Sequence, residues 1–217
     1  MTSIFISTLT CPTCGVTSPF ERHDVLDVSV TPELKQSIID WEFFKFTCNH
    51  CGYRAILDYP TLYIDPENKT AIQYLPSGIG FGNSISMSEL QSGKFDFSEF
   101  RYRVVANLEE FAEKVQIFSD GFDDRAIEVM KYIVSPKEED DIQFSYENMV
   151  FTKIGPTAYQ FMFINQNEAV ASLNFSFDLY QNALDDVHEL EENESIINEK
   201  WAEQQVRYGL KNTSPSR

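Results

Sequence analysis

Two Cys-x2-Cys pairs constrain the fold of this chain more than any other feature. They are Cys11-Pro-Thr-Cys14 and Cys48-Asn-His-Cys51, and they contain all four cysteines of the 217 residues. A glycine, Gly15 or Gly52, follows each pair, and glycine readily takes the positive φ with which a tight turn points its N–H groups at the sulfurs. Two such turns supply the four tetrahedral ligands of a closed structural zinc site. We therefore expect one structural Zn²⁺ on Cys11, Cys14, Cys48 and Cys51.

Other uses of the cysteines fit the sequence less well. The long segment between the pairs costs little, because closure entropy rises only with the logarithm of loop length. A redox Cys-x2-Cys needs its first sulfur at a helix N-terminus, whereas the strand-like segment 53–57 follows the second pair. Disulfides need an oxidising compartment, and the N-terminus lacks the features of a signal peptide. His23 or His50 could replace one sulfur as a ligand, and this alternative stays open.

The charge of the chain limits its partners. Acidic residues outnumber basic ones by 34 to 17, which gives a formal charge of −17. Zinc ribbons that bind nucleic acid present Lys and Arg to phosphates, and anionic membranes attract basic segments. The composition thus argues against nucleic acid and membrane surfaces, and it fits either a partner with a basic surface, which we expect to be a protein, or simple solubility. No segment is long enough to span a bilayer, and reduced cysteines without an export signal indicate the cytoplasm.

The pattern of apolar residues predicts an α+β protein. Its parts are a small antiparallel zinc-ribbon-like sheet, a helical hairpin, a second antiparallel β-meander and C-terminal helices. We expect four regions: a zinc-knuckle β subdomain with one short helix (residues 1–76), a Gly/Ser-rich loop (77–99), the helical hairpin with the meander and C-terminal helices (100–211), and a disordered tail (212–217). The expected strands are 3–9, 22–30, 41–47, 55–57, 62–64, 71–75, 100–105, 142–152, 159–165 and 169–175. A short helix is expected to start at Thr31-Pro32-Glu33, and four further helices are expected over 108–118, 122–134, 177–190 and 194–210.

Charged residues gather where the two hairpin helices should meet. Helix capping and solvation of the second helix explain such residues most simply, and on that reading Asp124→Ala leaves the stability almost unchanged. A cation or partner site is an alternative. A further alternative is an enzyme, either metal-dependent or carboxylate-based, because acid/base catalysis uses paired carboxylates. The residues concerned are Asp120, Asp123, Asp124, Arg125 and Glu128.

A second acidic stretch follows in the C-terminal helices. It comprises Asp185-Asp186 and residues 189–194. A solvated surface is the simpler interpretation, and a docking patch for a basic partner is the other. The leading hypothesis is therefore a zinc-stabilised cytoplasmic protein that binds another macromolecule through acidic surfaces.

Several motifs occur in a fixed order around the cysteine pairs. They are Cys11-Pro-Thr-Cys14-Gly15, Pro32-Glu-Leu-Lys35, Phe46-Thr-Cys48-Asn-His-Cys51-Gly52-Tyr53, Tyr59-Pro-Thr-Leu-Tyr63-Ile-Asp65, Glu113-Lys-Val-Gln-Ile-Phe118 and Asp120-Gly-Phe-Asp-Asp-Arg-Ala-Ile-Glu128. Together they resemble the CpXC family of bacterial proteins, from the first pair to about Lys131. One departure is Asn49, where the family more often has proline. The resemblance implies a zinc-binding module in a bacterial cytoplasmic protein, and it supplies no activity.

Overall fold

The chain forms two compact units, Met1–Val115 and Gln116–Arg217. A computed structural model describes residues 3–76, 99–136, 144–166, 168–188, 190 and 194–209. Those residues contain five helices and three sheets, which confirms the predicted α+β class. Almost all of the predicted Gly/Ser-rich loop 77–99 and the whole of the predicted tail 212–217 lie outside the described residues. No helix among those described combines the length and the apolar character needed to cross a membrane.

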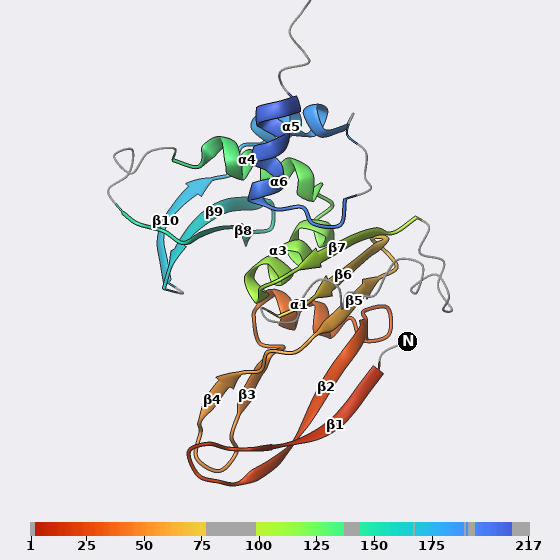
Figure 1. Cartoon of the computed structure of the whole chain (residues 1–217), viewed down its shortest axis with the longest axis vertical. Helices are drawn as coiled ribbons and strands as arrows, with labels where there is room; N and C mark the ends of the chain where they lie inside the picture. Colours follow the sequence, from red (N-terminus) through yellow and green to blue (C-terminus); the bar gives the residue numbers. More distant parts are fainter. Residues whose placement is uncertain are drawn as a thin grey trace, which may run out of the picture. The chain divides into compact units, whose positions relative to one another are not determined.

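The N-terminal unit is built on a five-stranded sheet with the order β1-β2-β5-β6-β7 (Figure 1). The β2–β5 and β6–β7 neighbours are parallel, and the other pairs are antiparallel. The sheet is thus larger and more mixed than the small antiparallel sheet that we expected. Its strands are β1 (Ser3–Thr10), β2 (Thr17–Asp27), β5 (Thr61–Asp65), β6 (Thr70–Tyr74) and β7 (Arg101–Val105).

Strand β7 explains why the observed division of the chain differs from the expected one. The sequence places residues 100–105 with the C-terminal part, but β7 pairs with β6 along its whole length. The contacts therefore separate the units within helix α3 (Leu108–Ser119), after Val115.

Two β-hairpins extend to the cysteine pairs. The first joins β1 to β2, and the second joins β3 (Lys45–Thr47) to β4 (Arg54–Ile56). Strand β2 ends at Asp27 rather than at the predicted residue 30. The N–H and hydroxyl groups of Ser29 both donate to the Asp27 carboxylate, at 3.1 and 2.5 Å. Such a side-chain turn competes with the strand and ends it.

Helix α1, Glu33–Ile39, begins one residue later than the predicted cap implies. Pro32 occupies the N-cap position, and no side chain caps the helix there. The hydroxyl of Thr31, which we expected to cap it, donates instead to the carbonyl oxygen of Asp27 at 3.2 Å.

The end of α1 shortens the strand that follows. Trp41 has φ of 62°, and the N–H groups of Trp41 and Glu42 donate back to carbonyls of the last turn at 3.0 and 2.8 Å. This is the Schellman pattern of helix termination. Because the cap uses these residues, the predicted strand 41–47 is reduced to Lys45–Thr47.

Aromatic side chains form much of the core of this unit. Strands β5 and β6 are buried at all of their positions, as expected for central strands covered on both faces. The ring of Phe44 packs against Tyr59, Tyr74 and Phe111, with centroids 5.2, 5.6 and 5.9 Å apart. Phe44 lies directly before β3, so this core continues into the cysteine-bearing hairpin.

A buried carboxylate fastens α1 to the sheet. Asp65, at the end of β5, is 2% exposed and pairs with the Lys35 ammonium at 2.7 Å. The Asn68 side chain and the Tyr63 hydroxyl also donate to it, at 2.8 and 3.1 Å. Burial by itself raises the pKa of the Asp65 carboxyl, but hydrogen bonds from Lys35 and Asn68 outweigh burial, and its pKa lies below the ordinary value.

We expect Lys35→Met to lower the free energy of unfolding by ~1–3 kcal/mol, because it leaves a buried carboxylate without its cation. Since the pKa of Asp65 is lowered by folding, this stabilisation is complete above the unfolded pKa and is lost as pH falls through the folded pKa. The difference from the wild type should therefore narrow toward acid pH in urea titrations. Lys45→Met is the control: its ion pair with Glu42 is exposed, and its loss should cost about 0–1 kcal/mol. Equal losses in the two variants would contradict the assignment.

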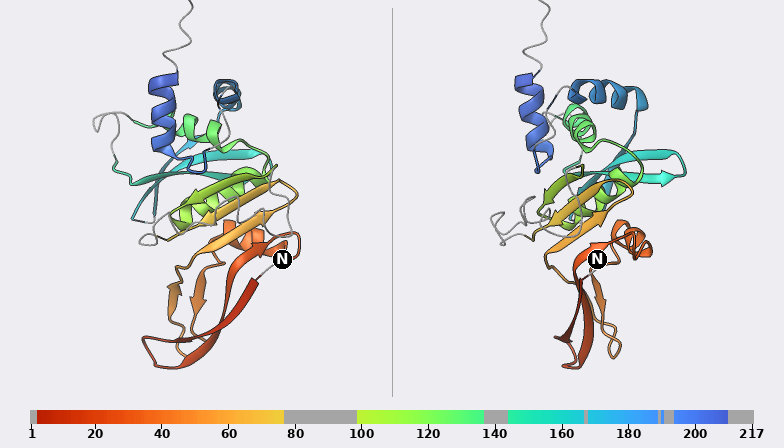
Figure 2. Two further views of the ribbon diagram at one scale, coloured as in Figure 1. Left: turned by 45° about the vertical axis from the view of Figure 1, so that its right-hand side comes forward. Right: turned by 90° about the vertical axis from the view of Figure 1, so that its right-hand side faces the viewer.

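The C-terminal unit contains the predicted antiparallel meander, with the strand order β10-β9-β8. Helix α4 contacts both α5 and α6. In both views of Figure 2 these helices lie on the same side of the three strands. The elements are α4 (Asp124–Val134), β8 (Asn148–Gly155), β9 (Ala158–Asn165), β10 (Glu168–Asn174), α5 (Phe177–His188) and α6 (Glu199–Gly209).

Candidate metal centre

Each cysteine pair forms the turn of a β-hairpin, and the two turns have the same backbone pattern. In the first, the N–H of Gly15 donates to the carbonyl of Cys11 at 2.9 Å; in the second, Gly52 donates to Cys48 at 2.9 Å. The glycines have φ of 72° and 74°, which confirms the predicted left-handed conformation. Neither pair opens a helix, because β2 follows the first and β4 follows the second. The helix N-terminus that activates a redox Cys-x2-Cys is therefore missing from both described turns.

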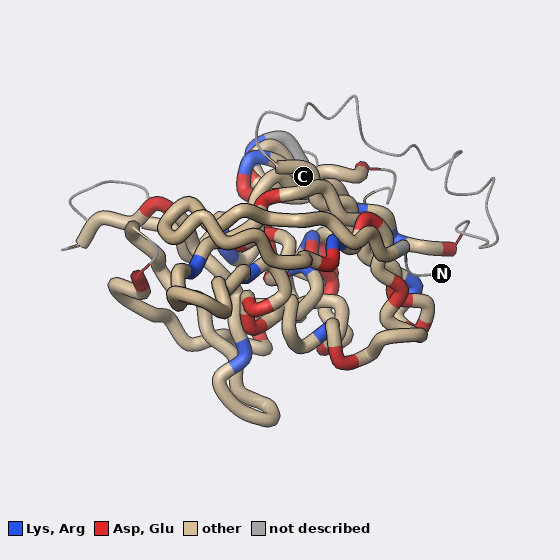
Figure 3. The backbone as a smooth tube through the Cα atoms, turned by 90° about the horizontal axis from the view of Figure 1, so that it is seen from below, with Lys and Arg blue, Asp and Glu red and all other residues tan. Residues whose placement is uncertain are grey.

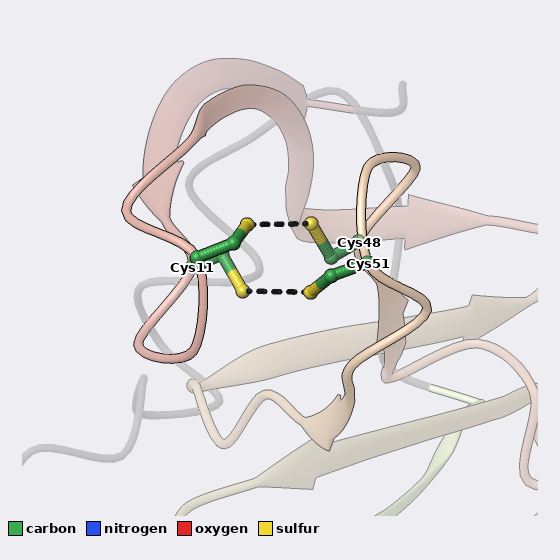
Figure 4. A group of neighbouring side chains, drawn as sticks. Cys11, Cys48 and Cys51 are labelled. Carbon is green, nitrogen blue, oxygen red and sulfur yellow. Dashed lines mark hydrogen bonds between the residues drawn. The ribbon is translucent and has the colours of Figure 1, made fainter.

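The two turns face each other and bring the four sulfurs together (Figure 4). The Sγ atoms of Cys11 and Cys51 lie 3.6 Å apart, and those of Cys14 and Cys48 lie 3.7 Å apart. All four lie within 4.8 Å of one another. A tetrahedral site with Zn–S bonds of about 2.3 Å has sulfur–sulfur edges of about 3.8 Å. A disulfide needs about 2.05 Å between its sulfurs, so the spacing is that of a metal site.

The thiols affect one another's pKa. Burial raises the pKa of Cys11, but the backbone N–H groups of Cys14 and Thr13 outweigh burial and lower the pKa to about 6. At Cys51 the backbone hydrogen bond of Tyr53 lowers the pKa, but burial and the neighbouring sulfurs raise it to about 12. Deprotonation of all four thiols would therefore need a compensating cation. A dication held by these four residues would favour the deprotonated form of each.

Apolar side chains surround the sulfurs. Cys11, Cys48 and Phe46 form one buried cluster, against which Leu9 and Leu57 pack. These side chains are not among the site residues that the sequence predicts. Leu9 and Phe46 each lie two residues before a cysteine pair, on the strand that leads into the turn, and this spacing is the signal that could have identified them. These side chains would limit water access to the Cys11 and Cys48 sulfurs of a metal site, whereas Cys51 is exposed.

Neither histidine proposed as an alternative ligand joins the group of sulfurs. His50 lies in the second turn, and its side chain is exposed. His23 lies on β2, where its ring packs against Phe43 with centroids 5.3 Å apart. The chemistry of the donor set is therefore that of four thiolates.

The predicted charged cluster contributes to the architecture of the C-terminal unit. Asp120 pairs with Lys153 at 2.6 Å. Asp123 is the N-cap of α4: its carboxylate accepts from the N–H of Arg125 at 2.9 Å and pairs with the Arg125 guanidinium at 2.8 Å. Its predicted capping role is thus confirmed. The Asp123 and Asp120 side chains are each 12% exposed, which leaves little carboxylate surface for an external cation or partner.

The other two acids of the cluster are buried rather than solvated. Asp124 is 0% exposed, and Glu128 is 2% exposed and pairs with Lys131 at 3.3 Å. The expectation that Asp124 is a surface residue is therefore wrong. Its place in the first turn of α4 agrees with the sequence pattern, but the pattern does not show which side of a helix start the rest of the fold covers.

Asp124→Ala should accordingly destabilise the protein by ~1–3 kcal/mol, since it removes a buried polar group from its partners. The measurement is urea unfolding at neutral pH. Asp178→Ala is the matched control, because Asp178 occupies the first turn of α5 and is exposed; a surface change of this kind stays within about 0.5 kcal/mol. If the two variants had the same stability, burial of Asp124 would have no energetic role.

Comparison with known proteins identifies the family. A family model described as CpXC protein matches residues 9–131, which is more than half of the chain. No curated protein and no solved structure matches the chain significantly. The chain belongs to the CpXC family, and the matched region includes both cysteine pairs.

Proposed function

We propose that this CpXC-family protein holds one structural zinc ion on Cys11, Cys14, Cys48 and Cys51 and acts by binding another protein in the cytoplasm. The observation that supports a structural role for the metal is that four cysteine sulfurs lie together in one cluster. Four thiolates occupy every position of a tetrahedral zinc, whereas catalytic zinc keeps one position for water or substrate. Reduced cysteines persist in a reducing compartment, which supports the cytoplasmic assignment.

Local charge around the cysteine pairs agrees with a thiolate-rich centre. Residues 3–20 carry no charged side chain, and β3–β4 carries Lys45, which pairs with Glu42, and Arg54, without an acidic residue in the two strands. A dication with four thiolates has a net charge of −2, so these two cations have the opposite sign. The acidity of the chain therefore comes from other segments, and Figure 3 shows Asp and Glu distributed along much of the described backbone.

The acidic face of α5 is the surface on which we place the partner. Ala183 and Val187 of this helix are buried, whereas Asp178, Asp185 and Asp186 are exposed. A basic protein surface complements such a face, and charges of this kind increase the rate of encounter more than the affinity. An enzyme site near Asp120–Glu128 has less support, because the carboxylates there are buried or paired within the unit.

Two measurements test the proposal. Metal analysis of the purified protein should give one zinc per chain, and a strong chelator should lower the melting temperature. Chemical cross-linking in cells should capture a protein on the wild type, and the double variant Asp185→Asn/Asp186→Asn should capture less of it at unchanged stability. Metal lost readily without a change in melting would contradict the structural role. Equal capture by both proteins would contradict the acidic docking surface.

A further inference from the structure

Strand β1 has an open edge in the part of the chain that the structure describes. It stands at the end of the order β1-β2-β5-β6-β7, and within the described residues it pairs with β2 alone. Figure 1 shows it on the outside of the hairpin that leads to the first cysteine pair. An unpaired edge presents N–H and C=O groups to which another strand can bond.

The hydrogen-bond pattern shows which residues face that edge. The N–H of Cys11 donates to the carbonyl of Val16 at 2.9 Å, and the same register continues from this pair as far as Ile4, beyond which it shifts. In an antiparallel ladder, bonded pairs recur at every second residue. Leu9, Ser7 and Phe5 therefore bond to β2. The alternate residues Thr10, Thr8, Ile6 and Ile4 direct their backbone groups to the open edge.

The side chains of β1 are unusual for an edge strand. Ile4, Phe5 and Ile6 are consecutive and are 50%, 50% and 77% exposed. The strand, Ser3–Thr10, contains no charged residue and no proline, although edge strands are commonly protected by lysine, proline or inward charges. In a protein that stays monomeric, three consecutive exposed apolar residues on such an edge are unfavourable unless they have a function.

We propose that β1 pairs with β1 of a second copy of this chain, antiparallel and about a two-fold axis at Phe5. This register places Ile4 of each copy opposite Ile6 of the other, and Phe5 opposite Phe5. Ile4 and Ile6 direct their backbone groups outward, so the two symmetry-related Ile4–Ile6 pairs are hydrogen-bonded and the Phe5 pair between them is not. Apolar side chains then meet on both faces of the joined sheet, and an isologous contact of this kind closes at a dimer.

A second copy fits this edge because the strand is complementary to itself. The charge of −17 would oppose association through most surfaces, but residues 3–20 have no charged side chain. On β2, Arg22 lies opposite Phe5 and pairs with Asp24 at 2.6 Å, so Glu21, opposite Ile6, is the one acidic side chain facing this part of β1 from β2. One strand from each copy buries an area at the low end for specific interfaces, so we expect a weak dimer that depends on concentration.

Sedimentation equilibrium of the zinc-loaded full chain, over about 1–500 µM, tests this pairing. The wild type should dimerise. Ile6→Lys places a cation against Ile4 of the other copy and should weaken the dimer at least about tenfold. Ile6→Pro should also weaken the dimer, because it removes an N–H that faces the open edge. It should leave the hydrogen bonds between β1 and β2 intact.

The controls separate this surface from others. Ile154→Lys changes an isoleucine of β8 that is 55% exposed and should leave the dimer intact. Zinc content and melting temperature at low concentration should stay the same in all variants. A photo-reactive residue in place of Phe5 should join position 5 of one copy to position 5 of another. A monomeric wild type, undisturbed association of the Ile6 variants, or equal weakening by Ile154→Lys would each overturn the proposal.

Discussion

Replacing Cys48 with serine is expected to abolish stoichiometric zinc binding and to lower the melting temperature by roughly 10 °C or more. Cys48 is buried and lies at the start of the second turn, with its sulfur 3.7 Å from that of Cys14. Serine keeps the size of the side chain but supplies a neutral hydroxyl, which is not among the usual ligands of zinc. Structural zinc contributes about 10–16 kcal/mol in small zinc-finger modules. Its loss should therefore separate the two hairpin turns.

The measurement is metal content by mass spectrometry together with a thermal scan. His50→Gln is the matched control, because His50 lies in the same turn, is exposed and is outside the group of sulfurs. It should retain one zinc and the wild-type melting temperature. Zinc retained by Cys48→Ser and lost from His50→Gln would mean that histidine replaces a sulfur as the ligand. Zinc retained by both variants would contradict the four-cysteine centre.

The candidate metal centre could be predicted because its signals are local. A Cys-x2-Cys pair followed by glycine specifies one turn, and the flanking β-branched and aromatic residues specify the hairpin around it. The five-stranded sheet could not be predicted in the same way. Strand β7 pairs in parallel with β6, and parallel neighbours need a long crossover that leaves no short turn motif in the sequence.

The burial of side chains at helix ends also could not be predicted from the sequence. Apolar spacing predicts a helix from Phe122, but α4 begins at Asp124, and Asp123 caps it. Phe122 comes before the helix because Gly121, with φ of 78°, ends α3 and the chain must turn before α4 starts. The position of the Phe122 ring therefore cannot be predicted from helical periodicity. The burial of Asp124 cannot be predicted for a related reason, since a charged residue in the first turn of a helix is usually exposed.

Phe122→Ala should therefore cost ~3–5 kcal/mol of stability, the range for removing a large buried aromatic side chain. The ring is nearly buried and packs against Tyr159, Tyr180 and Phe151, with centroids 5.0, 5.1 and 5.4 Å apart. Those rings come from β9, α5 and β8. One substitution thus removes ring contacts that join the turn before α4 to the sheet and to a C-terminal helix.

The experiment compares urea unfolding of Phe122→Ala with that of Phe177→Ala. Phe177 belongs to the same aromatic group, since its ring lies 5.1 Å from that of Phe175, but it is 54% exposed. Its removal should cost about 1 kcal/mol or less, because a partly exposed ring leaves no closed cavity. Phe122→Ala should keep one zinc per chain, since the ring contacts that it loses all lie in the C-terminal unit. Equal losses in the two variants would show that enclosure of the ring does not set its contribution to stability. Loss of zinc from Phe122→Ala would show that the metal centre depends on the core of the other unit.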